Sequence, residues 1–579
     1  MRPFELLWLL AALAIPGAVI TEYFASARAP AQGPAEPLPP SDRVAWAVAL
    51  AFVGIVTVTT LIQLLASWHV FVDDAFITFR YADNLMSGYG LRWNPQDAPT
   101  EGFTNLLFVI LTGTHRLVHL EPLLYARALS LLGLAGLLAL IYRVARRDLR
   151  SSAAIATVAA AAFLACSRSI EIACNGLETM LFAATFFLCF ERTLAYYRQG
   201  SPRILAFIGI AAFVALLLRP EAVFIPIAIT LVILLSRDDR AVRMRRELPY
   251  LYVAFGVPTL IYLIWKFWYF GSIVPNPALL KVPTSGAWLR PRGLQAIQEY
   301  FDGHRYLLLA AAASLLVTAG RKDMGRLTAA VLVAMYTVFY LRVDPLMNNS
   351  DRFLFPVTAL LLYLALPIVT YIIGFTIGSR LATPGKVAIA VLVLCALLYR
   401  LPDMPAAYRW IYATRNASNQ EPEERLEPLA RSLALFPGID KLSIASVDAG
   451  LVPYYTRAYH IDIAGLNTRY LAQEQDVQKL SNYIFARHPD LIIYRTRKDG
   501  GYVTYGHGHL GDERTWAANA GWDDYLYAGT ADQPDAHRLN IFVRRDAPNR
   551  DALVDYIQKR VVDYVLPQAP VPLGRDVHS

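Results

Sequence analysis

Long apolar segments separated by short polar loops fill the first two-thirds of the chain. A helix that crosses a membrane needs about 20 predominantly apolar residues, and segments close to this length recur. Residues 4–20 form one such run, and a Pro-rich stretch, 29–40, follows it. We predict an extra helix and a flexible linker there, for a total of about 11–12 spans. The other predicted spans are 45–67, 123–142, 152–167, 178–196, 204–218, 222–236, 249–270, 304–319, 327–341, 353–376 and 386–400.

The loop after the first of these spans mixes apolar and polar residues over 76–120. Phe76, Phe79 and Leu85 recur at near-helical spacing, with polar residues between them, and a similar pattern begins again at Leu106. This spacing is typical of helices that lie in the membrane interface rather than across it. We therefore expect two short amphipathic helices in this loop.

Residues 401–579 alternate strand-like and helix-like segments. Residues 476–488 have the period of an amphipathic helix. This alternation predicts a small α/β domain. No Gly-x-Gly-x-x-Gly follows a strand, so nucleotide binding is not supported. The strand-like segments are 442–447, 460–464, 491–494 and 540–543.

The composition agrees with a membrane protein that carries a polar appendage. Hydrophobic residues make up 56% of the chain and charged residues only 17%, whereas soluble domains carry roughly 25% charged residues. The net charge is +8, but residues 401–579 contain 20 Lys and Arg against 23 Asp and Glu. The basic excess therefore belongs to the membrane part. Membrane topology explains it better than nucleic-acid binding does.

The orientation follows from the basic loops, because Lys and Arg gather on the cytoplasmic side. Three loops are rich in these residues, and all three lie on the same side in this span count. The loop after span 45–67 and everything after residue 400 then face outward. The basic residues are Arg143, Arg146, Arg147 and Arg150, then Arg237, Arg240, Arg243, Arg245 and Arg246, and finally Arg321, Lys322 and Arg326.

The predicted fold is thus a polytopic α-helical membrane protein with a C-terminal extracytoplasmic α/β domain. Residues 1–44 form the N-terminal apolar helix and linker. Residues 45–400 form the transmembrane domain, with an outer loop at 68–122, and residues 401–579 form the outer domain.

Two adjacent carboxylates, Asp73 and Asp74, stand at the start of the outer loop. Paired acids at a membrane boundary are costly to desolvate, which suggests a purpose. One of them can act as a general base while the other orients it or binds an acceptor hydroxyl. The alternative is a pair of solvated acids at a helix end. The stretches 88–95 and 100–105 follow in the same loop.

Three stretches of this loop read Asp-Asp-Ala-Phe-Ile-Thr-Phe-Arg-Tyr-Ala-Asp-Asn-Leu, Gly-x-Gly-Leu-x-x-Asn and Thr-Glu-Gly-Phe-Thr-Asn. Together they resemble the first outer loop of GT-C glycosyltransferases. These polytopic enzymes take sugars from polyprenyl-phosphate carriers, and the chain looks most like the branch with the bacterial terminal arabinofuranosyltransferases. The resemblance implies that Asp73 is the catalytic base and Asp74 its neighbour. It implies for Glu101 a supporting or acceptor-contacting position.

Two further segments at outer span ends contain candidate sugar-binding residues. Residues 175–179 are similar to the family's Gly-Leu/Met-Glu-Thr element, so Glu178 is a candidate to bind sugar hydroxyls. Alternatively, it is a helix N-terminal acid favoured by the helix dipole. Arg219 precedes Pro220 and Glu221 at an outer turn. It either contacts the substrate or forms a local ion pair with Glu221.

Two cations are candidates to hold the phosphate of the lipid carrier. Residues 275–281 resemble the family's Pro-Asn-Thr-x-x-x-Lys segment, with Pro277 in place of Thr, and end at Lys281. Residues 351–356 resemble its Tyr-Arg-Phe-x-x-Pro element and contain Arg352. Arg binds phosphate in bidentate fashion. Snorkelling of a cation at a span end is the alternative for both.

His507 and His509 stand in a Gly-rich stretch near Asp512 and Glu513. This spacing suits a metal only if a third ligand converges on it. Contact with the acceptor, or simple solvation, is the better interpretation, and we predict no metal site and no cofactor.

The resemblance implies an inverting glycosyltransferase on the outer face of a bacterial inner (plasma) membrane. It would move a sugar, with arabinofuranose as one candidate, from a polyprenyl-phosphate carrier to a cell-envelope glycan, lipid or protein. Mannose or another sugar, moved to protein or lipopolysaccharide, is an alternative. The expected partners are the lipid-linked sugar, the acceptor and membrane lipid, without nucleic acid.

A transporter or lipid flippase is an alternative of another class. Transporters place polar residues and broken helices near the bilayer midplane, often in repeated halves. Here the unusual charges gather at outer span ends and no internal repeat is visible, which argues against transport. A purely structural assembly protein would not need the paired acids.

Overall fold

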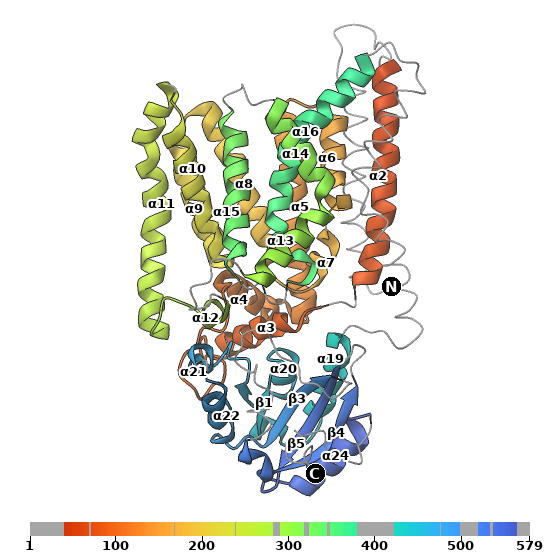
Figure 1. The fold of residues 1–579 in the computed structure, drawn as a ribbon, viewed down its shortest axis with the longest axis vertical. Coiled ribbons are helices and arrows are strands. Elements are labelled where there is room, and N and C mark those ends of the chain that lie inside the picture. Colours follow the sequence, from red (N-terminus) through yellow and green to blue (C-terminus); the bar gives the residue numbers. More distant parts are fainter. Residues whose placement is uncertain are drawn as a thin grey trace.

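The computed structural model of the chain consists of a helical bundle with a sheet domain at one end (Figure 1). The predicted N-terminal helix at 4–20 and the last predicted span, 386–400, lie outside the described residues. The structure describes residues 40–68, 71–166, 168–237, 239–281, 290–317, 323–343, 345, 348–378, 422–474, 476–497, 519–532 and 537–563.

Every predicted span that falls on described residues coincides with a helix, because apolar runs of this length bury their backbone polar groups best as helices. These helices are α2 (Pro40–Ser67), α5 (Pro122–Arg147), α6 (Ala153–Cys166), α8 (Thr179–Gln199), α9 (Pro202–Leu218), α10 (Phe224–Leu235), α11 (Asp239–Phe270), α14 (Arg305–Val317), α15 (Met324–Leu341) and α16 (Phe355–Gly378).

Among the described residues, α5, α11 and α15 are long and apolar enough to cross a membrane by length and composition, and further apolar helices are shorter. Helix α11 is the most exposed of the three. It stands at the edge of the bundle (Figure 1) and turns large apolar side chains such as Val253, Leu260 and Trp268 outward. An apolar exposed face of this kind is expected for a helix that contacts lipid.

Short helices fill the space between the bundle and the sheet domain (Figure 1). Two of them, α3 (Asp73–Met86) and α4 (Leu106–Gly113), are the helices predicted in the outer loop, and most residues of α3 are buried. The other short helices of the membrane part are α7 (Ser169–Cys174), α12 (Asn276–Lys281) and α13 (Pro291–Gly303). Its 3-10 turns are η1 (Thr114–Val118), η2 (Pro220–Val223) and η3 (Asn349–Asp351).

The sheet domain contains a five-stranded mixed sheet in the order β2-β1-β3-β5-β4. β1 pairs in parallel with β2 and β3, and β5 pairs antiparallel with β3 and β4. The strands are β1 (Ser443–Ser446), β2 (Tyr459–Asp462), β3 (Leu491–Arg497), β4 (Tyr525–Asp532) and β5 (His537–Arg544). The helices are α19 (Pro422–Ala434), α20 (Leu451–Thr456), α21 (Arg469–Gln473), α22 (Val477–Phe485) and α24 (Arg550–Arg560), with 3-10 turns η5 (Ile439–Lys441) and η6 (Ala520–Asp524).

The α/β fold and four of its strands are as predicted, but β4 was missed. Its register shifts between Tyr527 and Gly529, and Gly529 has a φ of 152°. This bulge interrupts the simple alternation of residues by which strands are recognised in a sequence.

Buried polar contacts join the sheet domain to the outer loop. The Arg80 guanidinium of α3 is buried and donates to the carbonyl oxygens of Ala458 (3.0 Å) and Pro453 in the sheet domain. The Asn94 amide donates to the His460 carbonyl oxygen at 3.0 Å. Because each of these buried groups has a partner in the other part, separating the two parts would leave the groups unpaired. The sheet domain is therefore held firmly against α3 and the segment that follows it.

Candidate active site

Both acids of the outer-loop motif lie in the first turn of α3. Val72 precedes them in an extended conformation and caps the helix without a side-chain hydrogen bond. The positive end of the helix dipole favours acids here. Because successive residues on a helix are rotated by about 100°, the carboxylates of Asp73 and Asp74 point in different directions.

Asp73 faces the sheet domain. Its Oδ2 accepts a hydrogen bond from the Gly450 N–H at 2.8 Å, and its Oδ1 accepts one from the Leu451 N–H at 2.7 Å. These donors belong to the first turn of α20, and the Asp73 side chain is buried. Burial, followed by repulsion from Asp448, raises the pKa of Asp73 to about 7, against the lowering effect of the two N–H donors. Asp73 thus joins α3 to α20.

Asp74 faces the bundle instead. Its Oδ2 accepts a hydrogen bond from Arg352 Nη2 at 2.9 Å, and its side chain remains 23% exposed. Arg352 itself is buried, and its guanidinium lies 4.9 Å from the ring centre of Phe353. Asp74 is thus the less buried acid of the pair, and Arg352 balances its charge.

A tight turn before α16 places Arg352 there. Ser350 and Asp351 have φ values of 57° and 59°, in the left-handed region. The Asn348 side chain stabilises the turn by accepting a hydrogen bond from the Phe353 N–H at 3.3 Å. Pro356 then stands in the first turn of α16, where a missing N–H is tolerated. The Asp351–Pro356 motif is therefore a turn that presents an arginine to Asp74.

Glu178 approaches the same region from the N-terminus of α8. Its Oε2 accepts a hydrogen bond from Asn105 Nδ2 at 2.9 Å, and Asn105 also donates to Thr78 Oγ1 at 3.3 Å. Gly176 forms the turn before it with a φ of 85°, and a Cβ there would press against Leu123 and Ala75. Glycine is therefore required at this position. The turn is what directs Glu178 toward α3.

Arg219 completes a cluster with Asp74, Glu178 and Arg352. Its Nη1 donates to Glu178 Oε1 at 3.3 Å and its Nη2 donates to Glu221 Oε1 at 2.9 Å. The Tyr340 hydroxyl donates to the same Glu221 oxygen. The Arg219 guanidinium also lies over the ring of Phe353, 4.9 Å from its centre. Arg219 thus forms both the local ion pair considered for it and a link to Glu178.

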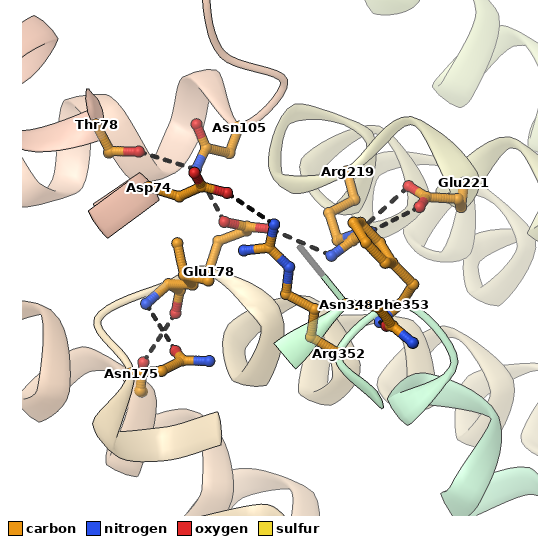
Figure 2. Close-up of polar contacts among 12 residues, drawn as sticks. Asp74, Thr78, Asn105, Asn175, Glu178, Arg219, Glu221, Asn348, Arg352 and Phe353 are labelled. Carbon is orange, nitrogen blue, oxygen red and sulfur yellow. Dashed lines mark hydrogen bonds and ion pairs between the residues drawn. The ribbon is translucent and has the colours of Figure 1, made fainter. Parts of the chain in front are cut away.

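Figure 2 shows the carboxylates of Asp74 and Glu178 converging with Arg219 and Arg352 from four separate segments of the chain. With Glu221, the cluster has three acids against two arginines. Several of its buried polar atoms have no hydrogen-bond partner among the described residues, which is unusual for buried groups. These atoms are Asn105 Oδ1, Asn175 Nδ2, Thr179 Oγ1 and Arg352 Nε. The cluster can therefore accept further polar groups from a ligand.

Glu101 lies in a different polar group. It is buried and forms an ion pair with Lys266 Nζ of α11 at 2.9 Å. Burial raises its pKa to about 7, against the lowering effect of Lys266. Its carbonyl oxygen accepts a hydrogen bond from the Asn276 N–H at 3.1 Å. This contact positions the start of α12, whose last residue is Lys281.

Lys281, His507 and His509 are the remaining predicted site residues. Lys281 ends α12, but its side chain is outside the described residues, as are His507 and His509. No group of three or more His, Cys, Asp or Glu residues that could hold a metal ion occurs in the described part of the chain. The absence of a metal and a cofactor stays a prediction.

The structure brings together Asp74, Glu178, Arg219 and Arg352, and turns Asp73 toward the sheet domain. Sequence reasoning did not single out Asn105, although it closes the Thr100–Asn105 motif, or Lys266 and Tyr340. Lys266 is a lysine within an apolar span, which is a recognisable signal. Tyr340 carries no comparable signal, because tyrosines are common at span ends.

Comparisons with known proteins agree on the fold class. Residues 106–265 match the family model of the dolichyl-phosphate-mannose-protein mannosyltransferases, and residues 439–570 match a domain of unknown function (DUF8728). The terminal β-(1→2)-arabinofuranosyltransferase of Mycobacterium tuberculosis is 30% identical over 229 residues, which cover 37% of this chain and 35% of that protein. The match thus spans about a third of the length of that curated relative.

Two solved structures are similar to most of the chain. ArnT from Cupriavidus metallidurans, bound to undecaprenyl phosphate, covers 87% of this chain and 98% of its own, with 13% identity and a TM-score of 0.52. The oligosaccharyltransferase AglB from Archaeoglobus fulgidus, in complex with an inhibitory peptide and a dolichol-phosphate, covers 86% of this chain and 75% of its own, with 12% identity and a TM-score of 0.52. These likenesses confirm the predicted GT-C-like fold, and the resemblance to the arabinofuranosyltransferase branch is confirmed by the curated relative.

Proposed function

We propose that this chain is an inverting glycosyltransferase that moves a sugar from a polyprenyl-phosphate carrier to an acceptor hydroxyl. The observation that carries the proposal is the ion pair between Asp74 and Arg352, next to Glu178 and Arg219, beside the outer-loop motif. In this reaction a carboxylate can take the proton of the acceptor hydroxyl, and a neighbouring cation can stabilise the phosphate that leaves the sugar. The names of the mannosyl-, arabinofuranosyl- and oligosaccharyltransferases to which the chain is similar support the same reaction type.

Asp74, rather than Asp73, is the base in this proposal. Asp73 is buried against the sheet domain, and both of its oxygens already accept backbone N–H groups at 2.7–2.8 Å, so an acceptor hydroxyl has no open approach to it. Asp74 is partly exposed, and Arg352 is its one charged partner among the described residues. A general base must come within hydrogen-bond reach of the proton that it takes. Asp73 becomes a positioning residue that fixes the start of α3.

The reaction is a single displacement at the anomeric carbon. Asp74 takes the proton of the acceptor hydroxyl, whose oxygen forms a new bond to the anomeric carbon. The bond between that carbon and the phosphate oxygen breaks on the opposite face, and its electron pair leaves with the lipid phosphate. Arg352 would stabilise the departing phosphate, because its buried Nε has no hydrogen-bond partner among the described residues.

The other members of the cluster would orient the sugar. Glu178 retains acceptor capacity beyond its contacts with Asn105 and Arg219. Sugar hydroxyls are donors that a carboxylate can bind. Arg219, held between Glu178 and Glu221, fixes the position of Glu178. The outer loop adds Glu101 as an acceptor-side residue. Lys281, at the end of α12, would be a second cation for the carrier phosphate.

The location and the substrates are part of the proposal. The basic loops support an outward-facing site in a bacterial inner membrane, with the sheet domain outside the cytoplasm. The name of the curated relative supports arabinofuranose as the sugar, and we propose a cell-envelope glycan as its acceptor. The mannosyltransferase family match over 106–265 supports mannose, with a protein acceptor, as the second candidate.

The test is transfer by the purified full chain in liposomes. Radiolabelled polyprenyl-phosphoryl arabinofuranose and polyprenyl-phosphoryl mannose are offered separately with envelope glycan as the acceptor. We expect transfer from one donor with inversion at the anomeric carbon, and loss of transfer by at least about 1,000-fold in Asp74→Asn.

The matched control is Asp440→Asn, which removes an exposed carboxylate of the sheet domain and should leave transfer unchanged. Normal transfer by Asp74→Asn would reject Asp74 as the base. Movement of an intact lipid-linked sugar across the bilayer, without any new glycosidic bond, would favour the flippase alternative.

A further inference from the structure

A pocket of about 670 Å³ opens at the end of the bundle opposite the sheet domain. Its walls are the segment after α5, the last turns of α8, the first turns of α11 and α15, and the middle of α16. Figure 1 shows these helix ends far from α3 and α4. The pocket is therefore separate from the candidate active site, and nothing in the proposed function uses it.

The charged residues of the pocket are four arginines and two aspartates. Arg198 pairs with Asp148, and Arg326 Nε lies 3.2 Å from Asp323 Oδ2. The other two arginines, Arg150 and Arg240, form no ion pair with a carboxylate in the described part of the chain. Among the described residues, the pocket thus has two positive charges without a carboxylate partner.

The rest of the lining is apolar or aromatic. Leu194, Met244 and Pro367 contribute to it, and Tyr371 stands at its rim with 64% of its surface exposed. Gly325 forms part of the wall, and a Cβ there would overlap the Leu194 side chain. The pocket therefore combines two arginines that form no ion pair among the described residues with apolar and aromatic side chains from several helices.

We propose that this pocket binds the phosphate group of an anionic phospholipid at the membrane surface opposite the candidate active site. Arg150 and Arg240 would hold the phosphate, because arginine forms paired charge-assisted hydrogen bonds to phosphate oxygens. The acyl chains would run along α16 next to Pro367 and Tyr371. Basic pockets between spanning helices on the cytoplasmic side are suited to such head groups. A free phosphate-bearing solute shares this chemistry, and the experiment distinguishes the two sources.

The experiment uses the full chain in nanodiscs of phosphatidylcholine with a minor fraction of phosphatidylglycerol. Native mass spectrometry then counts the phosphatidylglycerol molecules that stay bound to each chain. We expect the double variant Arg150→Gln/Arg240→Gln to bind phosphatidylglycerol at least about 10-fold more weakly, because each arginine near an anionic lipid contributes about 1 kcal/mol. Arg150→Lys/Arg240→Lys keeps both charges and should keep most of the binding.

The matched control is Arg203→Gln/Arg237→Gln, which removes two exposed arginines from the same end of the bundle but outside the pocket. Equal phosphatidylglycerol binding in the two glutamine variants would overturn the proposal. If the pocket variant is not monodisperse, the single variants Arg150→Gln and Arg240→Gln are compared in the same way. Binding of inorganic phosphate that depends on these arginines, without retention of phosphatidylglycerol, would reject the lipid as the source.

Discussion

The Asp73 carboxylate and the Gly450 backbone N–H meet at 2.8 Å although 377 positions separate the two residues in the sequence. Together with the Leu451 N–H, this contact makes an acid of the outer loop the cap of a helix in the sheet domain. The contact lies one residue away from Asp74. The position of the proposed base is therefore linked to the docking of the sheet domain.

Gly450→Ala should weaken this docking. A Cβ at position 450 would overlap the Asp73 carbonyl oxygen and carboxyl carbon, and backbone cannot move aside as a flexible side chain does. We expect a loss of roughly 1–3 kcal/mol in the free energy of unfolding and faster proteolysis between the two parts. Gly256→Ala is the control, because a Cβ there meets nothing within 4 Å. Equal thermal stability and proteolysis of the two variants would contradict this account.

Docking should also depend on pH through Asp73. The pKa of this carboxyl is about 7 in the folded protein, raised first by burial and then by Asp448, whereas an unfolded Asp titrates near 3.9. A raised acid pKa means that the folded state binds the proton more tightly. The stabilisation is complete below about pH 4 and is lost as the pH rises through 7.

The measurement is the thermal unfolding of the full chain between pH 5 and pH 8. We expect a fall in stability over this range that is smaller in Asp73→Asn, which cannot titrate. Glu101, with a pKa of about 7, and Asp462, with a pKa of about 6, titrate in the same range. The difference between the wild type and Asp73→Asn therefore isolates the contribution of Asp73. Identical pH dependence in both proteins would exclude it.

The fold was predictable where one local signal is enough. Apolar length defines the spans, and alternation defines β1, β2, β3 and β5. β4 was missed because Gly529 and a register shift interrupt its alternation. Helix bounds differ from the predicted ones mainly at polar ends, as in α11, which begins at Asp239 rather than at 249. A helix can continue through polar residues beyond its apolar part, and the apolar pattern then does not show where the helix begins.

The site was predictable in its residues but not in their directions. The sequence shows that Asp73 and Asp74 are adjacent, and it cannot show that α20 supplies two N–H groups to the first of them. The same limit applies to Glu101, whose partner Lys266 is distant in sequence. By contrast, the pairing of Arg219 with Glu221 was foreseeable, because the two residues are separated by a single proline.

Glu178→Gln should reduce turnover more than binding of the donor. The variant keeps an oxygen that can accept from Asn105, so the fold should persist. It loses the charge that faces Arg219 and that would orient the sugar hydroxyls. We expect kcat to fall by about 100-fold, with a change in KM of less than about 3-fold. The control is Glu299→Gln on α13, whose side chain is exposed. A rise in KM at unchanged kcat would instead assign Glu178 to ground-state binding.

Arg352→Lys separates the two proposed roles of the arginine. Lysine keeps the positive charge near Asp74 but lacks the planar pair of donors that suits a phosphate. We therefore expect a KM for the lipid-linked donor that is about 10-fold higher, while the KM for the acceptor stays near that of the wild type. Arg352→Gln, which removes the charge, should additionally lower kcat, because nothing then balances the charge of the departing phosphate. The measurement is steady-state transfer with the donor and the acceptor varied in turn. If Arg352→Lys raises only the KM for the acceptor, Arg352 serves Asp74 and not the phosphate, and Lys281 becomes the candidate cation for the carrier.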